Sequence, residues 1–106
     1  MIHIEFQTAD GEQLRCQGDE GASVMEVAVA HNVPGIDADC GGACACATCH
    51  VYVDAEGMAR LPPRGEQELK MLAFAVGVED GSRLACQLAV SRAIDGLVLR
   101  VPASQY

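Results

Sequence analysis

The stretch that decides the fold covers residues 40–50 and reads CGGACACATCH. It holds four of the six cysteines in this chain of 106 residues. Glycine and alanine contribute little to a side-chain core, so we expect residues 35–49 to form an irregular loop. Something other than apolar packing must therefore order this part of the chain.

Cysteines gathered in one loop are typical of metal binding or redox chemistry, because disulfide scaffolds usually spread their cysteines along the sequence. Three thiolates from one loop and a fourth from a distant segment, which Cys86 could supply, can surround a compact inorganic core. Four thiolates hold a 2Fe-2S cluster in this way, since thiolates suit iron and sulfide. Ligand chemistry alone leaves open which four of the six cysteines bind.

The spacing Cys40-x5-Cys46-x2-Cys49, with Cys86 in the segment SRLACQ, resembles the adrenodoxin and putidaredoxin family of 2Fe-2S ferredoxins. The plant type differs, because its first gap has four residues. The resemblance extends over the whole chain, including VPGIDAD at residues 33–39. It implies an α+β fold of the ubiquitin-like β-grasp type, with a mixed sheet, one main helix and a cluster-binding loop. It also implies that these four cysteines bind one cluster per chain.

The resemblance to bacterial members of that family implies a one-electron carrier and not an enzyme. The electron would pass from an FAD-containing, NAD(P)H-dependent ferredoxin reductase to an acceptor such as a cytochrome P-450 monooxygenase. A Rieske oxygenase or iron-sulfur cluster assembly is an alternative acceptor. From the residues alone, the alternative class is a zinc-binding or thiol-disulfide module, since Cys46-x2-Cys49 could be half of either motif.

Residues beside the ligands are expected to support the cluster. Gly41 and Gly42 lack side chains, so backbone N–H groups could approach the cluster sulfurs and raise the reduction potential. By resemblance, His50 braces the loop through hydrogen bonds to the backbone or to a neighbouring acid. Cys44 is expected to pack beneath the loop, and Cys16 to be a core residue or a free thiol.

Several charged residues, and one aromatic residue, have two expected roles. The resemblance implies an internal ion pair between Glu68 and Arg83. It also implies a docking surface for partner proteins, for which the candidates are Asp39, Glu66, Glu68, Glu79, Asp80 and the terminal aromatic residue Tyr106.

Composition narrows the possible partners and location. Fifteen acidic and seven basic side chains give a formal net charge of −8, which disfavours nucleic acid and anionic membranes as partners. The apolar runs are too short to span a bilayer, and the N-terminus lacks the features of a secretory signal. We therefore expect a cytoplasmic protein with a single domain over residues 1–106. We also expect it to be a monomer.

Periodicity predicts the secondary structure around the loop. Ile2, Ile4 and Phe6 alternate with polar residues and lead through an Asp10-Gly11 turn to a second strand. A capping box of Ser23 and Glu26 begins a helix that ends near Asn32 and Pro34. Later segments are predicted as a strand at 51–53, a helix with an apolar face of Leu69, Leu72, Ala73 and Val76, and strands at 84–90 and 97–101.

Overall fold

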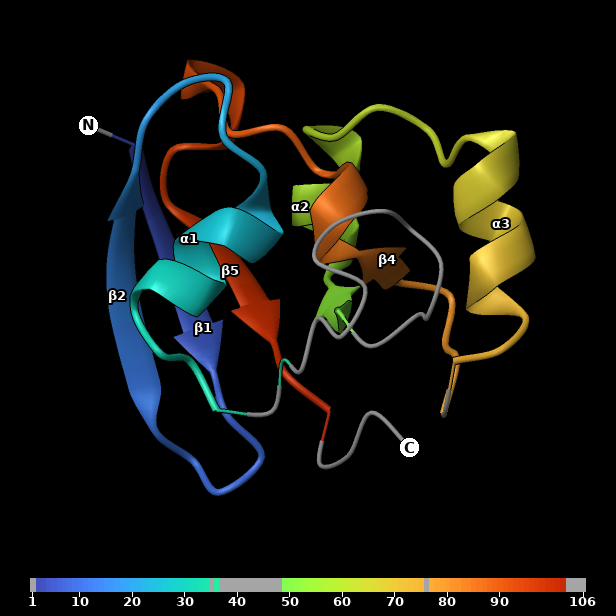
Figure 1. The fold of residues 1–106 in the computed structure, drawn as a ribbon, viewed down its shortest axis with the longest axis horizontal. Helices are drawn as coiled ribbons and strands as arrows, with labels where there is room; N and C mark the ends of the chain where they lie inside the picture. Colours follow the sequence, from blue (N-terminus) through green and yellow to red (C-terminus); the bar gives the residue numbers. More distant parts are fainter. Residues whose placement is uncertain (1, 35, 37–48, 76, 103–106) are drawn as a thin grey trace.

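The computed structural model describes residues 2–34, 36, 49–75 and 77–102 of the chain. Its sheet has the strand order β2-β1-β5-β3-β4, in which β1 and β5 are parallel and the other neighbours are antiparallel (Figure 1). The mixed sheet is therefore confirmed. The strands are β1 (Ile2–Gln7), β2 (Gln13–Gly18), β3 (His50–Val53), β4 (Ser82–Leu84) and β5 (Leu97–Arg100).

The first two strands form the predicted hairpin. Ile2, Ile4 and Phe6 are buried and alternate with partly exposed residues along β1. Gly11 has a φ of +95°, a left-handed conformation that glycine adopts without steric cost and that suits the turn after Asp10. Cys16 pairs with Ile4 and is buried in the core, where burial raises the pKa of its thiol.

The main helix, α1 (Val24–Ala30), packs its buried residues against the core. In Figure 1 it lies across β1 and β5. Ser23 Oγ accepts a hydrogen bond of 3.0 Å from the backbone N–H of Glu26, which confirms the predicted N-cap. Asn32 has a φ of 54°, and the chain leaves the helix there as predicted.

Replacing the N-cap residue Ser23 should lower the stability of the fold by a modest, measurable amount. We expect Ser23→Ala to lower the free energy of unfolding by about 1 kcal/mol, because one backbone N–H at the helix start loses its acceptor. Thermal unfolding followed by far-ultraviolet circular dichroism would measure it. Ser91→Ala is the matched control, since Ser91 precedes the 3₁₀ turn η2 (Arg92–Ile94) without a side-chain capping bond. An equal effect of both variants would contradict the capping role.

The predicted strand at 84–90 is wrong for most of its length. β4 ends at Leu84, and a 3₁₀ turn, η1 (Ala85–Gln87), follows. The reason is a change of hydrogen-bond partner, because the segment leaves β3 and bonds to the residues around the start of α1. The backbone N–H of Val24 donates to Leu88 O at 2.8 Å, and that of Val90 donates to Ala22 O at 2.8 Å.

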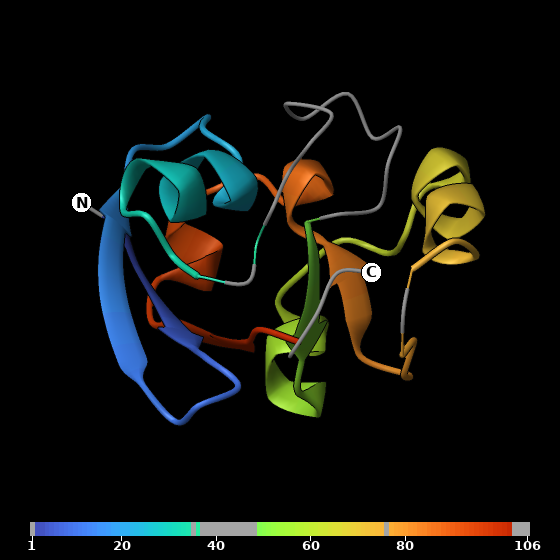
Figure 2. The same ribbon diagram turned by 60° about the horizontal axis from the view of Figure 1, so that its bottom comes forward.

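Two helices lie between β3 and β4 in the sequence. The short α2 (Ala55–Ala59), which the sequence analysis missed, begins where Asp54 Oδ1 accepts a 2.7 Å hydrogen bond from the backbone N–H of Gly57. The second predicted helix is α3 (Glu66–Leu72), which flanks β4 in both views of the ribbon (Figures 1 and 2). Its predicted apolar face is wrong in part, because Leu69 is 55% exposed and Ala73 is exposed, while Leu72 is buried. Val76 lies outside the described residues. Glu68, in contrast, is buried.

Candidate metal centre

Pairing of β3 with β4 brings together two cysteines that are far apart in the sequence. Cys49 immediately precedes β3 and Cys86 lies in η1, immediately after β4. His50 pairs with Leu84, and the backbone N–H of Ala85 donates a 2.9 Å hydrogen bond to Cys49 O. Cys49 is buried and Cys86 is half-buried. Two sulfur donors are thus held by neighbouring, hydrogen-bonded segments.

The other predicted residues of the loop lie outside the part of the chain that the structure describes. These are Asp39, Cys40, Gly41, Gly42, Cys44 and Cys46, and Tyr106 at the C-terminal end is also outside it.

Gln87, which the sequence analysis did not single out, contacts one of these cysteines. Its side-chain amide Nε2 lies 3.7 Å from Cys86 Sγ and donates a hydrogen bond to it. The only signal in the sequence is that a residue with an amide donor follows Cys86 directly.

His50 links β3 to β4 within the core. Its Nε2 lies 2.8 Å from Ser82 Oγ, with which it shares a hydrogen bond, and the ring is fully buried. Ser82 Oγ also accepts a 2.7 Å hydrogen bond from the backbone N–H of Glu79. The described contact of His50 is therefore to a hydroxyl group, which in turn positions the chain before β4.

A buried ion pair joins α3 to β4, as expected. The guanidinium of Arg83 donates two hydrogen bonds to the carboxylate of Glu68, at 2.8 and 3.1 Å, and the backbone N–H of Leu84 donates a third at 2.9 Å. The side chains are only 1% and 2% exposed. Glu68 cannot also dock a partner, so its expected place on the docking surface is wrong. The pair instead fixes β4 immediately before Cys86.

Tyr52, Arg100 and Glu79 form a cluster at the surface beside β3 and β5. Tyr52 Oη donates a 2.7 Å hydrogen bond to Gly77 O, and the Arg100 guanidinium carbon lies 5.0 Å from the centre of the tyrosine ring. Arg100 also pairs with Glu79 at 3.3 Å. Burial and the charge of Glu79 raise the pKa of Tyr52, against the opposing charge of Arg100, so the hydroxyl stays a hydrogen-bond donor.

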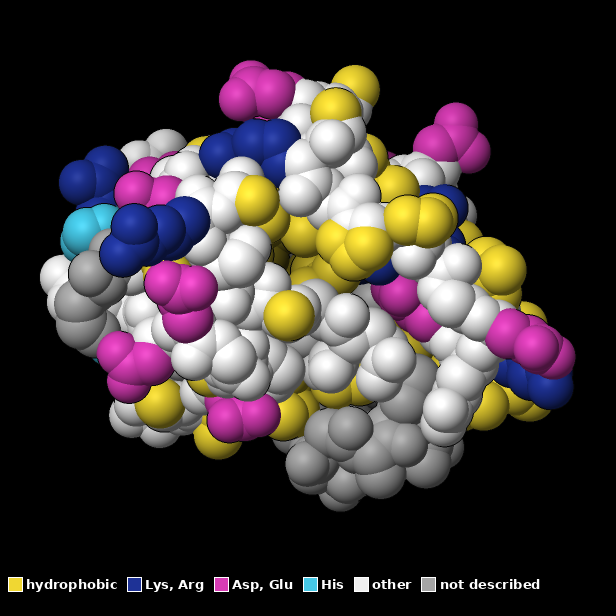
Figure 3. Space-filling view, turned by 90° about the horizontal axis from the view of Figure 1, so that it is seen from above, with side chains coloured by type: hydrophobic (Ala, Val, Ile, Leu, Met, Phe, Trp, Pro, Cys, Tyr) yellow, Lys and Arg dark blue, Asp and Glu magenta, His cyan; other side chains and the backbone are white. Residues whose placement is uncertain are grey.

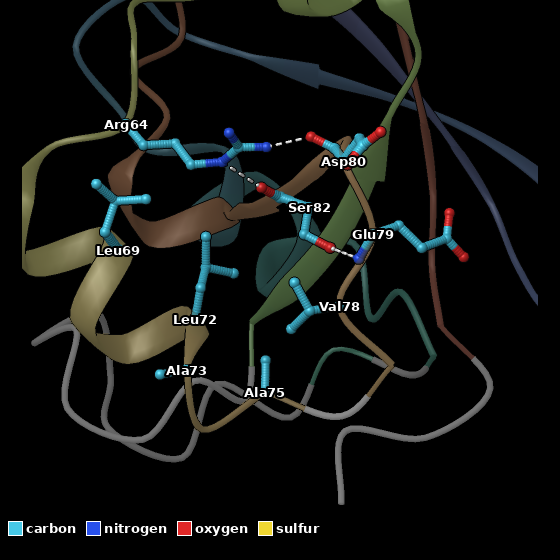
Figure 4. A pocket seen from close by; sticks show the side chains of 9 residues that line it. All are labelled: Arg64, Leu69, Leu72, Ala73, Ala75, Val78, Glu79, Asp80 and Ser82. Carbon is cyan, nitrogen blue, oxygen red and sulfur yellow. Dashed lines mark hydrogen bonds between the residues drawn. The ribbon is translucent and has the colours of Figure 1, made fainter.

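A surface groove of about 580 Å³ lies between α3 and the segment before β4 (Figure 4). Arg64 spans its polar end, where Nε donates a 2.8 Å hydrogen bond to Ser82 O and Nη2 donates to Asp80 O. Leu69, Val78 and the nearby Phe74 are more than half exposed. The apolar lining comes from Leu69, Leu72, Ala73, Ala75 and Val78.

The described acidic side chains do not gather in one patch on the face seen in Figure 3, where they are scattered over it. Glu66 pairs with Lys70 at 3.3 Å on the outer side of α3.

Among the described helices, none is long and apolar enough to cross a membrane.

Comparison with known proteins decides the family. Residues 7–91 match the model of the 2Fe-2S iron-sulfur cluster binding domain. The chain belongs to the 2Fe-2S ferredoxins. Ferredoxin CarAc from a Sphingomonas species is 43% identical over 98% of this ferredoxin and 95% of that relative. Putidaredoxin from Pseudomonas putida is 35% identical over the full length of both chains.

Solved structures agree with the fold of this ferredoxin. A crystal structure of a reduced cysteine-to-serine variant of putidaredoxin from Pseudomonas putida superposes with a TM-score of 0.95 at 34% identity, covering 98% of this chain and 99% of the other. The expected β-grasp ferredoxin fold, with its mixed sheet and main helix, is therefore confirmed.

The donor set fits the family's cofactor, because the described part of the chain places two cysteine sulfurs on adjoining segments. Members of this family carry one 2Fe-2S cluster per chain, so this ferredoxin is an electron-transfer protein and not an enzyme. The family therefore favours the cluster over the zinc-binding or thiol-disulfide alternative.

Proposed function

We propose that the thiolates of Cys40, Cys46, Cys49 and Cys86 hold the cluster of this single-domain ferredoxin. The observation that carries the proposal is the β3–β4 pairing, which brings the segments of Cys49 and Cys86 together. The loop spacing supplies the other two ligands, and Cys44 is not among them. When bound, the cluster supplies a centre that accepts and releases one electron. Gly41, Gly42 and His50 support it from outside the ligand set.

The electron donor in this proposal is an FAD-containing, NAD(P)H-dependent ferredoxin reductase. The putidaredoxin chain in a covalent complex with putidaredoxin reductase is 35% identical to this ferredoxin and superposes with a TM-score of 0.90. That likeness covers 94% of this chain and 97% of the other. The acceptor is an oxygenase such as a cytochrome P-450, with a Rieske oxygenase or cluster assembly as the alternatives. The carrier acts as a monomer.

Partners dock on acidic side chains, for which the candidates are Asp39, Glu66, Glu79 and Asp80, with Tyr106 as an aromatic contact. Lys70 and Arg100 already pair with Glu66 and Glu79. Asp80 is exposed and has no side-chain ion pair within the described residues, so its charge is available to a basic partner. Asp80 is therefore the acid expected to contribute most among those described.

Reduction by such a reductase tests the carrier and its docking surface together. Under anaerobic conditions, NADH and the reductase should add one electron per cluster and produce a spin-half paramagnetic signal. Asp80→Lys should raise the KM of the reductase for the ferredoxin roughly 3- to 10-fold at low salt, because a docking charge is reversed. The kcat should be unchanged, and the effect should shrink at high ionic strength.

Glu12→Lys is the matched control, since Glu12 is an exposed acid near the β1–β2 turn and undergoes the same charge change. Equal KM values for the two variants would contradict docking at Asp80 and leave the carrier intact. A wild-type protein with no paramagnetic signal after reduction would contradict the proposal that it is an electron carrier.

Mixing the reduced ferredoxin with a cytochrome P-450 or a Rieske oxygenase in a stopped-flow instrument would compare the rates of electron transfer to the two acceptors.

A further inference from the structure

The side chain of Gln87 lies against a sulfur atom that the proposed function assigns to the cluster. Nε2 of Gln87 is 3.7 Å from Cys86 Sγ, a distance at which an amide N–H donates to sulfur. Gln87 is otherwise exposed, so the amide is not drawn to this position by burial in the core.

The backbone on both sides of this contact is fixed. Before it, the N–H of Ala85 donates to Cys49 O at 2.9 Å, and after it, the N–H of Leu88 donates to Ala85 O at 3.2 Å. Leu88 O in turn accepts the 2.8 Å hydrogen bond from Val24 at the start of α1. Cys86 and Gln87 therefore stand on a short 3₁₀ turn that is anchored to β3 and α1.

We infer that Gln87 is a positioning residue for electron transfer, whose side-chain amide donates a hydrogen bond to the Cys86 thiolate and raises the reduction potential. The inference rests on the proposed function, because it requires Cys86 to be a ligand. A donor beside a thiolate offsets negative charge, and the reduced cluster carries one negative charge more than the oxidised cluster. The hydrogen bond therefore stabilises the reduced form more than the oxidised form.

Gln87→Met tests the inference, because methionine has nearly the same length and no N–H donor. We expect the midpoint potential of the variant, from a redox titration followed by the paramagnetic signal, to shift to a lower value than that of wild type. Gln13→Met is the matched control, since Gln13 is an exposed glutamine on the edge strand β2. Its potential should equal that of wild type.

A second readout reports the contact itself. With ¹⁵N in glutamine side-chain amides, pulsed paramagnetic resonance of the reduced protein should show a hyperfine coupling in wild type and in Gln13→Met. The coupling should be absent in Gln87→Met. An unchanged potential in Gln87→Met, or no coupling in wild type, overturns the inference. If Cys86→Ala retains the cluster, the assignment of Cys86 as a ligand is wrong. Failure of that assignment is thus distinguishable from failure of the role inferred for Gln87.

Discussion

Glu68→Leu is expected to lower the free energy of unfolding by about 3–5 kcal/mol, because it leaves the buried guanidinium of Arg83 without its carboxylate. The backbone N–H of Leu84 also loses its acceptor. Pro62 O would remain the only described acceptor for Arg83. For a chain of this size the melting temperature of the oxidised protein should fall by about 12 °C or more.

Glu66→Leu is the matched control on the same helix. Glu66 is 86% exposed and its pair with Lys70 is solvated, so the expected loss is about 0.5 kcal/mol or less. A double variant, Glu68→Leu with Arg83→Met, should recover part of the loss, since it removes the unpaired charge. Similar melting temperatures for Glu68→Leu and Glu66→Leu would show that the buried pair does not stabilise the fold.

Cys86→Ala and Cys49→Ala are each expected to abolish stable cluster binding, because three thiolates leave one iron without its fourth ligand. Wild type should contain about two iron and two sulfide per chain after anaerobic preparation, and both variants close to none. Iron and acid-labile sulfide analysis, with the visible absorption spectrum, would measure this. Loss of iron from both variants would support the two proposed ligands that lie in the described part of the chain.

Cys16→Ala is the control for replacing a cysteine of the core. Cys16 is 2% exposed on β2, and its variant should keep a full complement of iron. Cys44→Ala should keep it as well, because the proposed ligand set does not include Cys44. Iron loss in Cys44→Ala, together with full iron in Cys86→Ala, would require a different ligand set.

The sequence predicts the first half of the fold well, since local signals decide it. Alternation along Ile2–Gln7, a glycine in the turn and a serine N-cap all act within a few residues of each other. The spacing of the four proposed ligands is also visible in the sequence. The pairing that brings Cys49 to Cys86 is not, because it depends on contacts between β3 and β4.

Tertiary contacts explain where the sequence analysis fails. By residue type alone, a glutamate on α3 is typical of a surface acid, which is why Glu68 is expected on the docking surface. The pair with Arg83 is expected only by resemblance, and this contact is what makes burial of Glu68 favourable. The residues after Leu84 are apolar enough for a strand, yet they bond to the chain before α1. The helix Ala55–Ala59 is too short to show an amphipathic period.

The position of β5 in the sheet has a consequence for folding during synthesis. It is the last of the described strands, but it lies between β1 and β3 and joins the hairpin β1–β2 to the pair β3–β4. During synthesis, the two parts of the sheet cannot be joined until the residues of β5 have been made. Such long-range pairing makes folding slow relative to local structure. A chain that stopped before Leu97 would leave two unconnected pairs of strands, so this sheet cannot form until residues 97–100 have been added.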